Sequence, residues 1–241
     1  MSIHIDLTNK SAVVTGGTRG IGLAIANQLR LAGANVIITG TNPDALIPND
    51  FQFIAVDFLS EMATQECIHF LTETQPDILI NNAGINTIDN FEHITVSDFD
   101  RIHQVNVRVP FLFCQAVIPG MKNKKWGRIV NVSSIFGKIS KAGRASYSAS
   151  KFALDGMTAA LAAEVAVFGV LANCVAPGFI DTELTRRILG SEQMQQLAAQ
   201  IPLGRLGQVD EIAKLVLWLA STENTYVSGQ NIVIDGGFTR V

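Results

Sequence analysis

The sequence contains a tyrosine and a lysine whose side chains could act together in proton transfer, Tyr147 and Lys151 in the segment ASYSASK. On a helix, residues i and i+4 lie on one face, so this phenol and this ammonium would point into the same pocket. A free phenol has a pKa of about 10, too high for ready proton exchange at neutral pH. At about 4 Å and an effective dielectric of about 20, an ammonium favours the phenolate by about 4 kcal/mol before solvent screening. We therefore expect Lys151 to lower the pKa of Tyr147 toward neutrality.

A glycine-rich segment, TGGTRGIG at 15–22, follows the first apolar run and precedes a helical pattern. Glycines let the backbone turn sharply and approach a pyrophosphate, whose charge is stabilised by free N–H groups at a helix start. The spacing is GxxxGxG rather than the GxGxxG of the usual dinucleotide fingerprint, and a plain tight turn is an alternative for this segment taken alone. A second polar cluster, NNAG at 81–84, follows the fourth apolar run, where open α/β sheets bind ligands. A simple turn is the alternative there too.

Short apolar runs alternate with amphipathic stretches along the whole chain. Strands buried on both faces read as continuous apolar runs, so this alternation predicts a parallel sheet flanked by helices, a doubly wound α/β (Rossmann) fold in one domain, 1–241. Strands are expected at 12–15, 36–39, 51–56, 78–80, 129–132, 171–175 and 232–234, and helices at 21–31, 61–73, 97–117, 146–168, 183–199 and 209–220. Two prolines within 40–50 predict a loop or a single helical turn in that connection.

The composition excludes several kinds of protein. The chain has 241 residues, 48% of them hydrophobic and 16% charged, which suits one large core and argues against disorder. The net charge of −3 and the lack of a basic run longer than KNKK at 122–125 argue against a nucleic-acid partner. The sequence has no secretory signal pattern and no apolar run of the roughly 18 residues that span a membrane. We expect a soluble, cytoplasmic protein without a membrane partner.

Cysteine and histidine spacings do not predict a metal site. Cys67, Cys114 and Cys174 are far apart and lie in apolar segments, where cysteine usually acts as a small buried hydrophobe. The four histidines show no HExxH or similar ligand spacing. We expect three buried thiols and no bound metal.

Taken in order, TGGTRGIG, NNAG, Ser134 and the Tyr147-x-x-x-Lys151 spacing resemble the motifs of the short-chain dehydrogenase/reductase family. The segments NCVAPGFIDT at 173–182 and GQNIVIDGG at 229–237 extend the resemblance over essentially the whole chain. The resemblance implies a seven-stranded parallel sheet, a nicotinamide-dependent oxidoreductase and a homotetramer. The main local departure from the family is the short connection at 40–50.

The resemblance also implies a role for each of four residues. Tyr147 would be the general acid or base, Ser134 would bind the carbonyl, and Lys151 would bind the nicotinamide ribose. Asn106 would hold a water in a proton path. Each residue has a structural alternative, because hydroxyl and amide groups also satisfy buried backbone groups.

The cofactor is expected to be NADP(H). NAD-binding folds place an acid about 20 residues beyond the glycine turn, whereas the second expected strand here ends in TGTN at 39–42. Arg19, inside the glycine-rich segment, could instead bind a 2′-phosphate through charge-assisted hydrogen bonds. The expected cofactor contacts are Gly16, Thr18, Arg19, Gly20, Ile21, Gly22, Thr41, Asn42, Asp57, Asn82, Ala83, Gly84, Tyr147, Lys151, Pro177, Gly178, Ile180 and Thr182.

Residues 178–203 correspond to the family's substrate lid, with apolar contacts offered by Leu184, Ile188, Leu189 and Met194. An apolar face that serves packing alone is the alternative. The segments GRIVNVSS, VAPGFIDTELT and IPLGRLGQVDEIA resemble those of bacterial 3-oxoacyl-acyl-carrier-protein reductases. Reduction of a 3-oxoacyl thioester, as a small molecule or carried on an acyl carrier protein, is therefore the favoured reaction.

Other functions are open. An acidic carrier protein could bind Arg128 with Lys125, or Arg186 with Arg187, although solvated surface charge is the commoner reason for such residues. Reductases of sugars, polyols or secondary metabolites share the same motifs. A catalytically silent cofactor-binding regulator is a different class, which the intact tyrosine and lysine disfavour. A serine hydrolase is disfavoured because Ser134 lacks a GxSxG turn.

Overall fold

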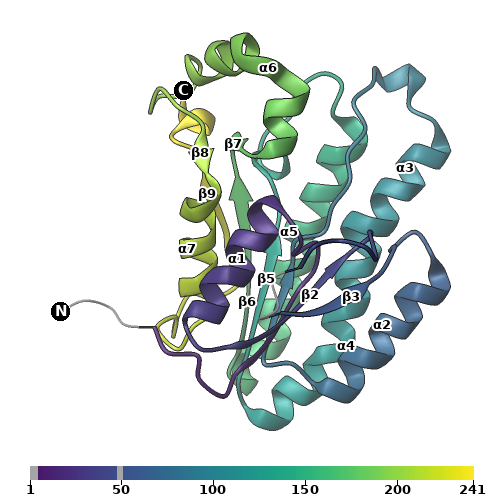
Figure 1. Cartoon of the computed structure of the whole chain (residues 1–241), viewed down its shortest axis with the longest axis vertical. Coiled ribbons are helices and arrows are strands. Elements are labelled where there is room, and N and C mark those ends of the chain that lie inside the picture. Colours follow the sequence, from purple (N-terminus) through teal and green to yellow (C-terminus); the bar gives the residue numbers. More distant parts are fainter. Residues whose placement is uncertain (1–4, 48–50) are drawn as a thin grey trace.

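Seven parallel strands form one sheet in the order β3-β2-β1-β4-β5-β6-β9 (Figure 1). The structure is a computed structural model, and it describes residues 5–47 and 51–241. The predicted seven-stranded α/β fold is confirmed. The strands are β1 (Ser11–Val14), β2 (Asn35–Gly40), β3 (Gln52–Ala55), β4 (Ile78–Asn81), β5 (Gly127–Val132), β6 (Val170–Pro177) and β9 (Asn231–Ile234).

The strand order reverses beside β1. The chain builds outward from β1 to β3 and then crosses to β4, so that Val14 is paired with Ile38 on one side and with Ile80 on the other. In open α/β sheets, ligands bind outside the carboxyl ends of the strands at such a reversal. The glycine-rich turn after β1 and the segment after β4 both leave the sheet at this point.

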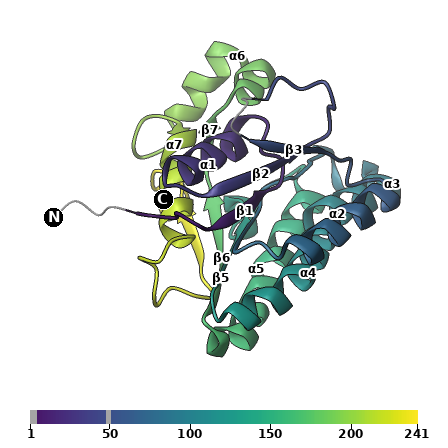
Figure 2. The same ribbon diagram turned by 60° about the horizontal axis from the view of Figure 1, so that its bottom comes forward.

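Helices cover both faces of the sheet (Figures 1 and 2). On one face, α1 and α7 pack on Val14, Ile80 and Val130, while the other core contains Val13 and Leu79. Adjacent residues of each strand therefore enter opposite cores, which explains why the strands read as continuous apolar runs. The helices are α1 (Gly20–Leu31), α2 (Glu61–Thr74), α3 (Val96–His103), α4 (Val109–Lys124), α5 (Ala145–Val165), α6 (Glu183–Ala198) and α7 (Val209–Leu219).

The single helix predicted at 97–117 is divided into α3 and α4, which together extend from Val96 to Lys124. A π-helical turn, Gln104–Arg108, separates α3 from α4, and the Val109 N–H donates to the Gln104 carbonyl oxygen. Single π turns frequently occur at functional sites. Short 3₁₀ turns lie at Phe91–His93, Ile135–Gly137, Ala166–Phe168 and Phe238–Arg240.

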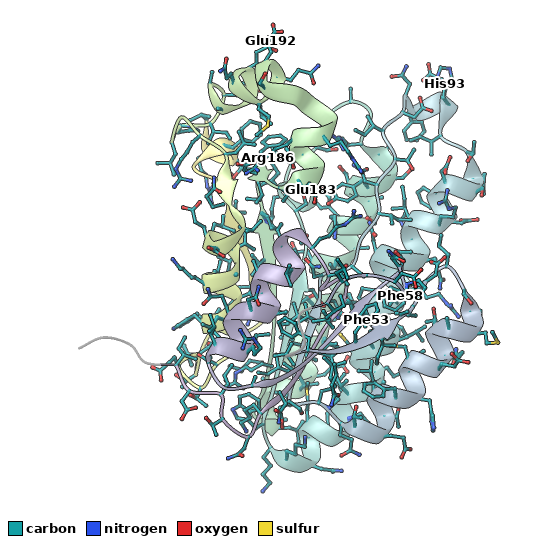
Figure 3. The ribbon with its side chains drawn as sticks, in the orientation of Figure 1. Phe53, Phe58, His93, Glu183, Arg186 and Glu192 are labelled. Carbon is teal, nitrogen blue, oxygen red and sulfur yellow. The ribbon has the colours of Figure 1, made fainter. Side chains whose placement is uncertain are left out.

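The sequence did not reveal a small second sheet, in which β7 (Ile180–Asp181) pairs with β8 (Gly207–Gln208). Between these two strands α6 rises above the carboxyl edge of the main sheet, with Glu183 at its end nearest the sheet and Glu192 toward the other (Figure 3). Gly190 interrupts α6 with a φ of 67°. The described part of the 40–50 connection, residues 41–47, contains no helix, and 48–50 lie outside the described residues.

The structure also tests two predictions that were made from the composition and the residue pattern. All three cysteines are free and buried, as expected. Across residues 5–47 and 51–241, no helix has both the length and the apolar character needed to cross a lipid bilayer.

Candidate active site

The glycine-rich segment forms the turn between β1 and α1. Gly16 and Gly20 have φ values of 63° and 56°, which residues with a side chain rarely adopt. A Cβ at Gly22 would overlap the carbonyl oxygen of Gly16 and the amide of Asn82. Glycine is therefore required for the turn's own packing. Thr18, Arg19 and Ile21 lie on the same turn, and Arg19 immediately precedes α1.

The segment after β4 supports that turn. The Asn82 side chain donates to the carbonyl oxygens of Thr15 and Gly16 at 2.9 and 3.0 Å. The Thr15 hydroxyl accepts from the N–H groups of Asn82 and Ala83, both at 2.9 Å. Asn82 thus links the segment after β4 to the glycine-rich turn after β1. Its position in the sequence alone did not indicate this structural role.

The packing at the end of β2 disfavours an acidic side chain at the position of Gly40. A Cβ at Gly40 would lie 2.5 Å from the Thr18 side chain, so an Asp or Glu there would require Thr18 to move. Thr41 and Asn42, which follow Gly40, are exposed, as is Arg19 on the glycine-rich turn, and no ion pair involves Arg19 among the described residues. A tight glycine turn, a missing acid and an uncommitted guanidinium fit a dinucleotide with a 2′-phosphate.

Three of the predicted catalytic residues meet beyond the carboxyl end of β5. Ser134 is buried and precedes a 3₁₀ turn, where its hydroxyl accepts from the Phe136 N–H at 3.1 Å. Ser134 also acts on the phenol of Tyr147, on the first turn of α5, in the direction that lowers the pKa of that phenol. One turn later the buried Lys151 ammonium lies 5.6 Å from the centroid of the Tyr147 ring. The structure therefore brings these three residues together.

The electrostatics of Tyr147 differ from the sequence-based expectation. Burial raises the pKa of Tyr147, while the hydrogen bond with Ser134 and the charge of Arg144 act in the opposite direction. The expected fall of this pKa toward neutrality is therefore wrong for this arrangement. The Lys151 ammonium instead donates to the Val132 carbonyl oxygen at 2.8 Å, and burial lowers the pKa of Lys151 to about 8.

Asn106 lies on the π-helical turn and links the segment after β4 to α5. Its side-chain oxygen accepts from the Ile85 N–H at 2.9 Å, and its amide group donates to the Ile85 carbonyl at 2.9 Å and to the Ser150 hydroxyl at 3.1 Å. Ser150 in turn donates to the Tyr147 carbonyl oxygen at 2.7 Å. The Asn106 side chain thus links Ile85, after β4, to Ser150, the residue that precedes Lys151 on α5. Gly84 opens onto the same place, since a Cβ there would lie 3.6 Å from the Lys151 nitrogen.

The other predicted cofactor residues surround this edge. Asp57 is exposed beyond β3 and accepts from the Leu59 N–H at 3.0 Å. Pro177 ends β6, and a Cβ on Gly178 would lie 2.7 Å from the side chain of Asp235, so that glycine permits close packing of the chain. Ile180 lies on β7. Thr182 caps α6, and a Cβ on Gly20 would lie 3.8 Å from its methyl group, so α6 begins beside the glycine-rich turn.

One predicted partner-binding residue is not available. Arg128 is buried and donates to the carbonyl oxygens of Ser221 and Asn224 at 3.1 and 3.0 Å, so it cannot contact a carrier protein. It is a structural residue because its guanidinium satisfies carbonyls that would otherwise be unpaired. Arg186 is exposed but is held by Asp181 through bonds of 2.6 and 2.9 Å.

Arg144 is a site residue that the sequence reasoning missed. It caps the start of α5, three residues before Tyr147, and its charge acts on that phenol. The spacing was visible in the sequence, but nothing in it shows that the arginine side chain lies beside the tyrosine and not in solvent.

This fold and this arrangement define a class of nucleotide-dependent oxidoreductases. The family model described as Enoyl-(Acyl carrier protein) reductase matches residues 16–239, and the chain belongs to the short-chain dehydrogenase/reductase family.

Its relatives include bacterial enzymes named 3-oxoacyl-[acyl-carrier-protein] reductase FabG. The chain is 37% identical to that of Rickettsia bellii, covering 98% of this chain and 100% of the relative, and 40% identical to that of Pseudomonas aeruginosa, covering 97% and 98%. A solved gluconate 5-dehydrogenase from Burkholderia cenocepacia, in complex with NADP and tartrate, has a TM-score of 0.90 and 30% identity over 99% of this chain and 98% of the other.

Proposed function

We propose that this oxidoreductase reduces 3-oxoacyl thioesters with NADPH, on small carriers or on acyl carrier protein. The observation that carries the proposal is the group formed by Ser134, Tyr147 and Lys151 beside the glycine-rich turn. The names of the full-length relatives support the thioester as substrate and a carrier protein as partner. A regulator without activity is disfavoured because every group needed for proton transfer is in place.

Each side chain has a defined task in this reaction. The Ser134 hydroxyl donates a hydrogen bond to the ketone oxygen, and Tyr147 gives its proton to that oxygen. The phenol of Tyr147, whose pKa is raised by burial, is protonated at neutral pH and therefore carries the proton to be transferred. Lys151 holds the ribose and places a positive charge beside the phenol, while Asn106 positions the segments that carry both. NADPH, when bound, supplies the hydride.

Replacing Arg19 with Ala is expected to raise the KM for NADPH by about 10- to 100-fold, because a charge-assisted contact contributes about 1.5–3 kcal/mol. The KM for NADH should stay within about threefold, because NADH lacks the 2′-phosphate. The measurement is steady-state reduction of an acetoacetyl thioester with each cofactor.

Arg101→Ala, which removes an exposed arginine of α3, is the matched control and should change neither constant. Better efficiency of the wild-type enzyme with NADH would contradict the proposed cofactor. Failure to reduce the thioester with either cofactor would contradict the proposed substrate.

The efficiency of reduction, kcat/KM, is expected to fall as the pH rises through about 8, where Lys151 loses its proton. Below that pH the ammonium is present and Tyr147 is protonated, so the rate should be level; above it the positive charge beside the phenol is lost. A pH profile from 6 to about 10 in constant ionic strength measures this. The Lys214→Gln variant, altered at an exposed position on α7, should give the same profile. A rate that stays level to pH 10 would contradict the role of Lys151.

The surface supports a proposal about assembly. We propose a homotetramer in which the α4 and α5 face forms one contact, because Phe111 and Phe152 are 49% and 47% exposed there. A shallow depression lined by Val107, Phe111 and Met157 lies on the same face. Sedimentation of the wild-type protein would give the mass of four chains.

Two further proposals concern the lid and the compartment. We propose that residues 178–203 form the substrate lid, with a break at Gly190 and the half-buried Met194 available for contact. The side chains of Leu184, Ile188 and Leu189 lie outside the described residues. Limited proteolysis with and without NADPH would test closure of this lid.

We also propose that the protein is cytoplasmic, because three free, buried cysteines suit a reducing compartment.

A further inference from the structure

Arg144 lies against the groups that would bind a ketone. Its guanidinium carbon is 5.3 Å from the centroid of the Phe136 ring, and the Phe136 N–H donates to the Ser134 hydroxyl. On its other side, the Arg144 carbonyl accepts from the Ser148 N–H at 2.7 Å, which places Tyr147 on the first turn that follows. The guanidinium therefore lies beside the segment of the carbonyl-binding serine, and its charge also acts on the phenol of the proton donor.

The charge on Arg144 has no counter-ion among residues 5–47 and 51–241. Its Nε atom is buried without a hydrogen-bond partner, and burial lowers the pKa of the guanidinium. The neighbouring Lys138 is paired with Asp155 at 2.8 Å, so that acid is already engaged. A partly buried cation without a partner carries a desolvation cost that a bound anion would offset.

A second cation and an aromatic group border the same place. The Lys141 nitrogen lies 5.9 Å from the Phe136 ring and 6.0 Å from the Phe179 ring, and it has no carboxylate partner in the described ranges. Phe179 packs edge to face on Phe136 and on Phe238, with centroids 6.2 and 5.1 Å apart. This end of the site thus offers positive charge beside a small apolar surface.

We propose that Arg144 binds the carboxylate of a short 3-oxo acid whose ketone faces Ser134 and Tyr147. A guanidinium presents paired N–H donors that match a carboxylate. In a 3-oxo acid a single methylene separates the ketone from the carboxylate, so both groups fit a site whose cation and proton donor lie within one helical turn. The thioester of the same acid is neutral at that position and would gain less from the charge.

The inference rests on the proposed reductase chemistry and extends it to free acids. The ketone carbon gains a hydride from NADPH, which is oxidised to NADP⁺, and the ketone oxygen gains the proton of Tyr147. The product is a 3-hydroxy acid with an unchanged carboxylate. Arg144 would then be a specificity-determining residue that selects for substrate charge.

The test compares acetoacetate with the S-acetoacetyl-N-acetylcysteamine thioester, each reduced with NADPH. Wild type should reduce both. Arg144→Gln should lower kcat/KM for acetoacetate by about 10- to 100-fold, mainly through KM, as expected for loss of a charge-assisted contact. Its kcat/KM for the thioester should fall much less, because that substrate loses only the effect of the Arg144 charge on Tyr147, and Arg144→Lys should restore part of the loss. Lys214→Gln should alter neither substrate.

Two results would overturn the inference: a wild type that reduces the thioester but not acetoacetate, or an Arg144→Gln variant that loses both activities equally. If wild type reduces neither ketone, the proposed reductase function fails, and a binding measurement decides the carboxylate site by itself. Butyrate, added with NADP⁺, should raise the melting temperature of wild type but not of Arg144→Gln, whereas butyramide should raise neither. Equal shifts in the two proteins would refute the site.

Discussion

Tyr147→Phe is expected to lower kcat by about 10²- to 10⁴-fold, the range typical for loss of a general acid. The substitution removes only the hydroxyl, so the aromatic ring still fills its place at the start of α5. The dissociation constant for NADPH, measured by fluorescence titration, should change by less than about threefold, because Tyr147 is only one of many expected cofactor contacts and those on the glycine-rich turn are unchanged. Stopped-flow measurement of a single turnover would show that the chemical step is the one affected.

The chain offers a matched control in its other tyrosine. Tyr226 is 96% exposed, and Tyr226→Phe should leave both kcat and cofactor affinity unchanged. A Tyr147→Phe enzyme with near-normal turnover would remove the assignment of the proton donor. Equal loss of turnover and cofactor binding would instead indicate that the hydroxyl supports the structure of the site.

Gly22→Ala should damage both stability and cofactor binding. The added methyl group would overlap the Gly16 carbonyl and the Asn82 amide, which are themselves fixed by the hydrogen bonds across the switch point. Overpacking of this kind costs about 1–3 kcal/mol in the free energy of unfolding. Any displacement of the turn also moves the N–H groups that would bind a pyrophosphate, and the NADPH dissociation constant rises about tenfold for each 1.4 kcal/mol lost.

Gly156→Ala is the control for the loss of helical glycine itself. Gly156 lies within α5, and a Cβ there would meet nothing within 4 Å. Gly156 lies one turn after Phe152, on the face proposed to contact a second chain, so the comparison is made on the dissociated chain. There the substitution should stabilise the fold by about 0.5–1 kcal/mol, since alanine is the better helix former. Urea denaturation of the two variants measures the contrast. A Gly22→Ala protein as stable as Gly156→Ala, with normal cofactor affinity, would contradict the packing argument.

The main sheet could be predicted because its central strands, such as β4 and β5, are buried on both faces. Val13 and Val14 enter different cores, so consecutive positions of this strand are apolar and the strand is recognised as a continuous apolar run. The helix ends were predicted within a few residues where capping residues such as Ser60 mark them. The π turn was missed because an extra residue in a helix leaves a pattern of buried positions that is still nearly helical. The β7–β8 pair was missed because two-residue strands have no measurable period.

The parts of the candidate site that depend on spacing along one helix could be predicted from the sequence. The parts that depend on tertiary contacts could not. Tyr147 and Lys151 are neighbours on one helix, and their proximity follows from helical geometry. The burial of Arg128 by segments near residue 221 depends on contacts nearly a hundred residues apart. The same limitation applies to the pKa of Tyr147, because burial is a property of the folded chain and outweighs the nearby charges.

The π-helical turn accommodates one extra residue between α3 and α4, and it sets the direction of Asn106. Each helical residue advances the chain by about 100° around the axis, since an α-helix has about 3.6 residues per turn. Deleting one residue between Gln104 and Arg108 would convert the turn to α-helix with little rotation of α4, because the π turn accommodates one extra residue in about one helical turn. Phe113 and Val117 would therefore stay in their core, whereas Asn106 would no longer point at Ile85 and Ser150. A family member lacking this extra residue would keep the same apolar positions along α4 and would need another residue to link the segment after β4 to α5.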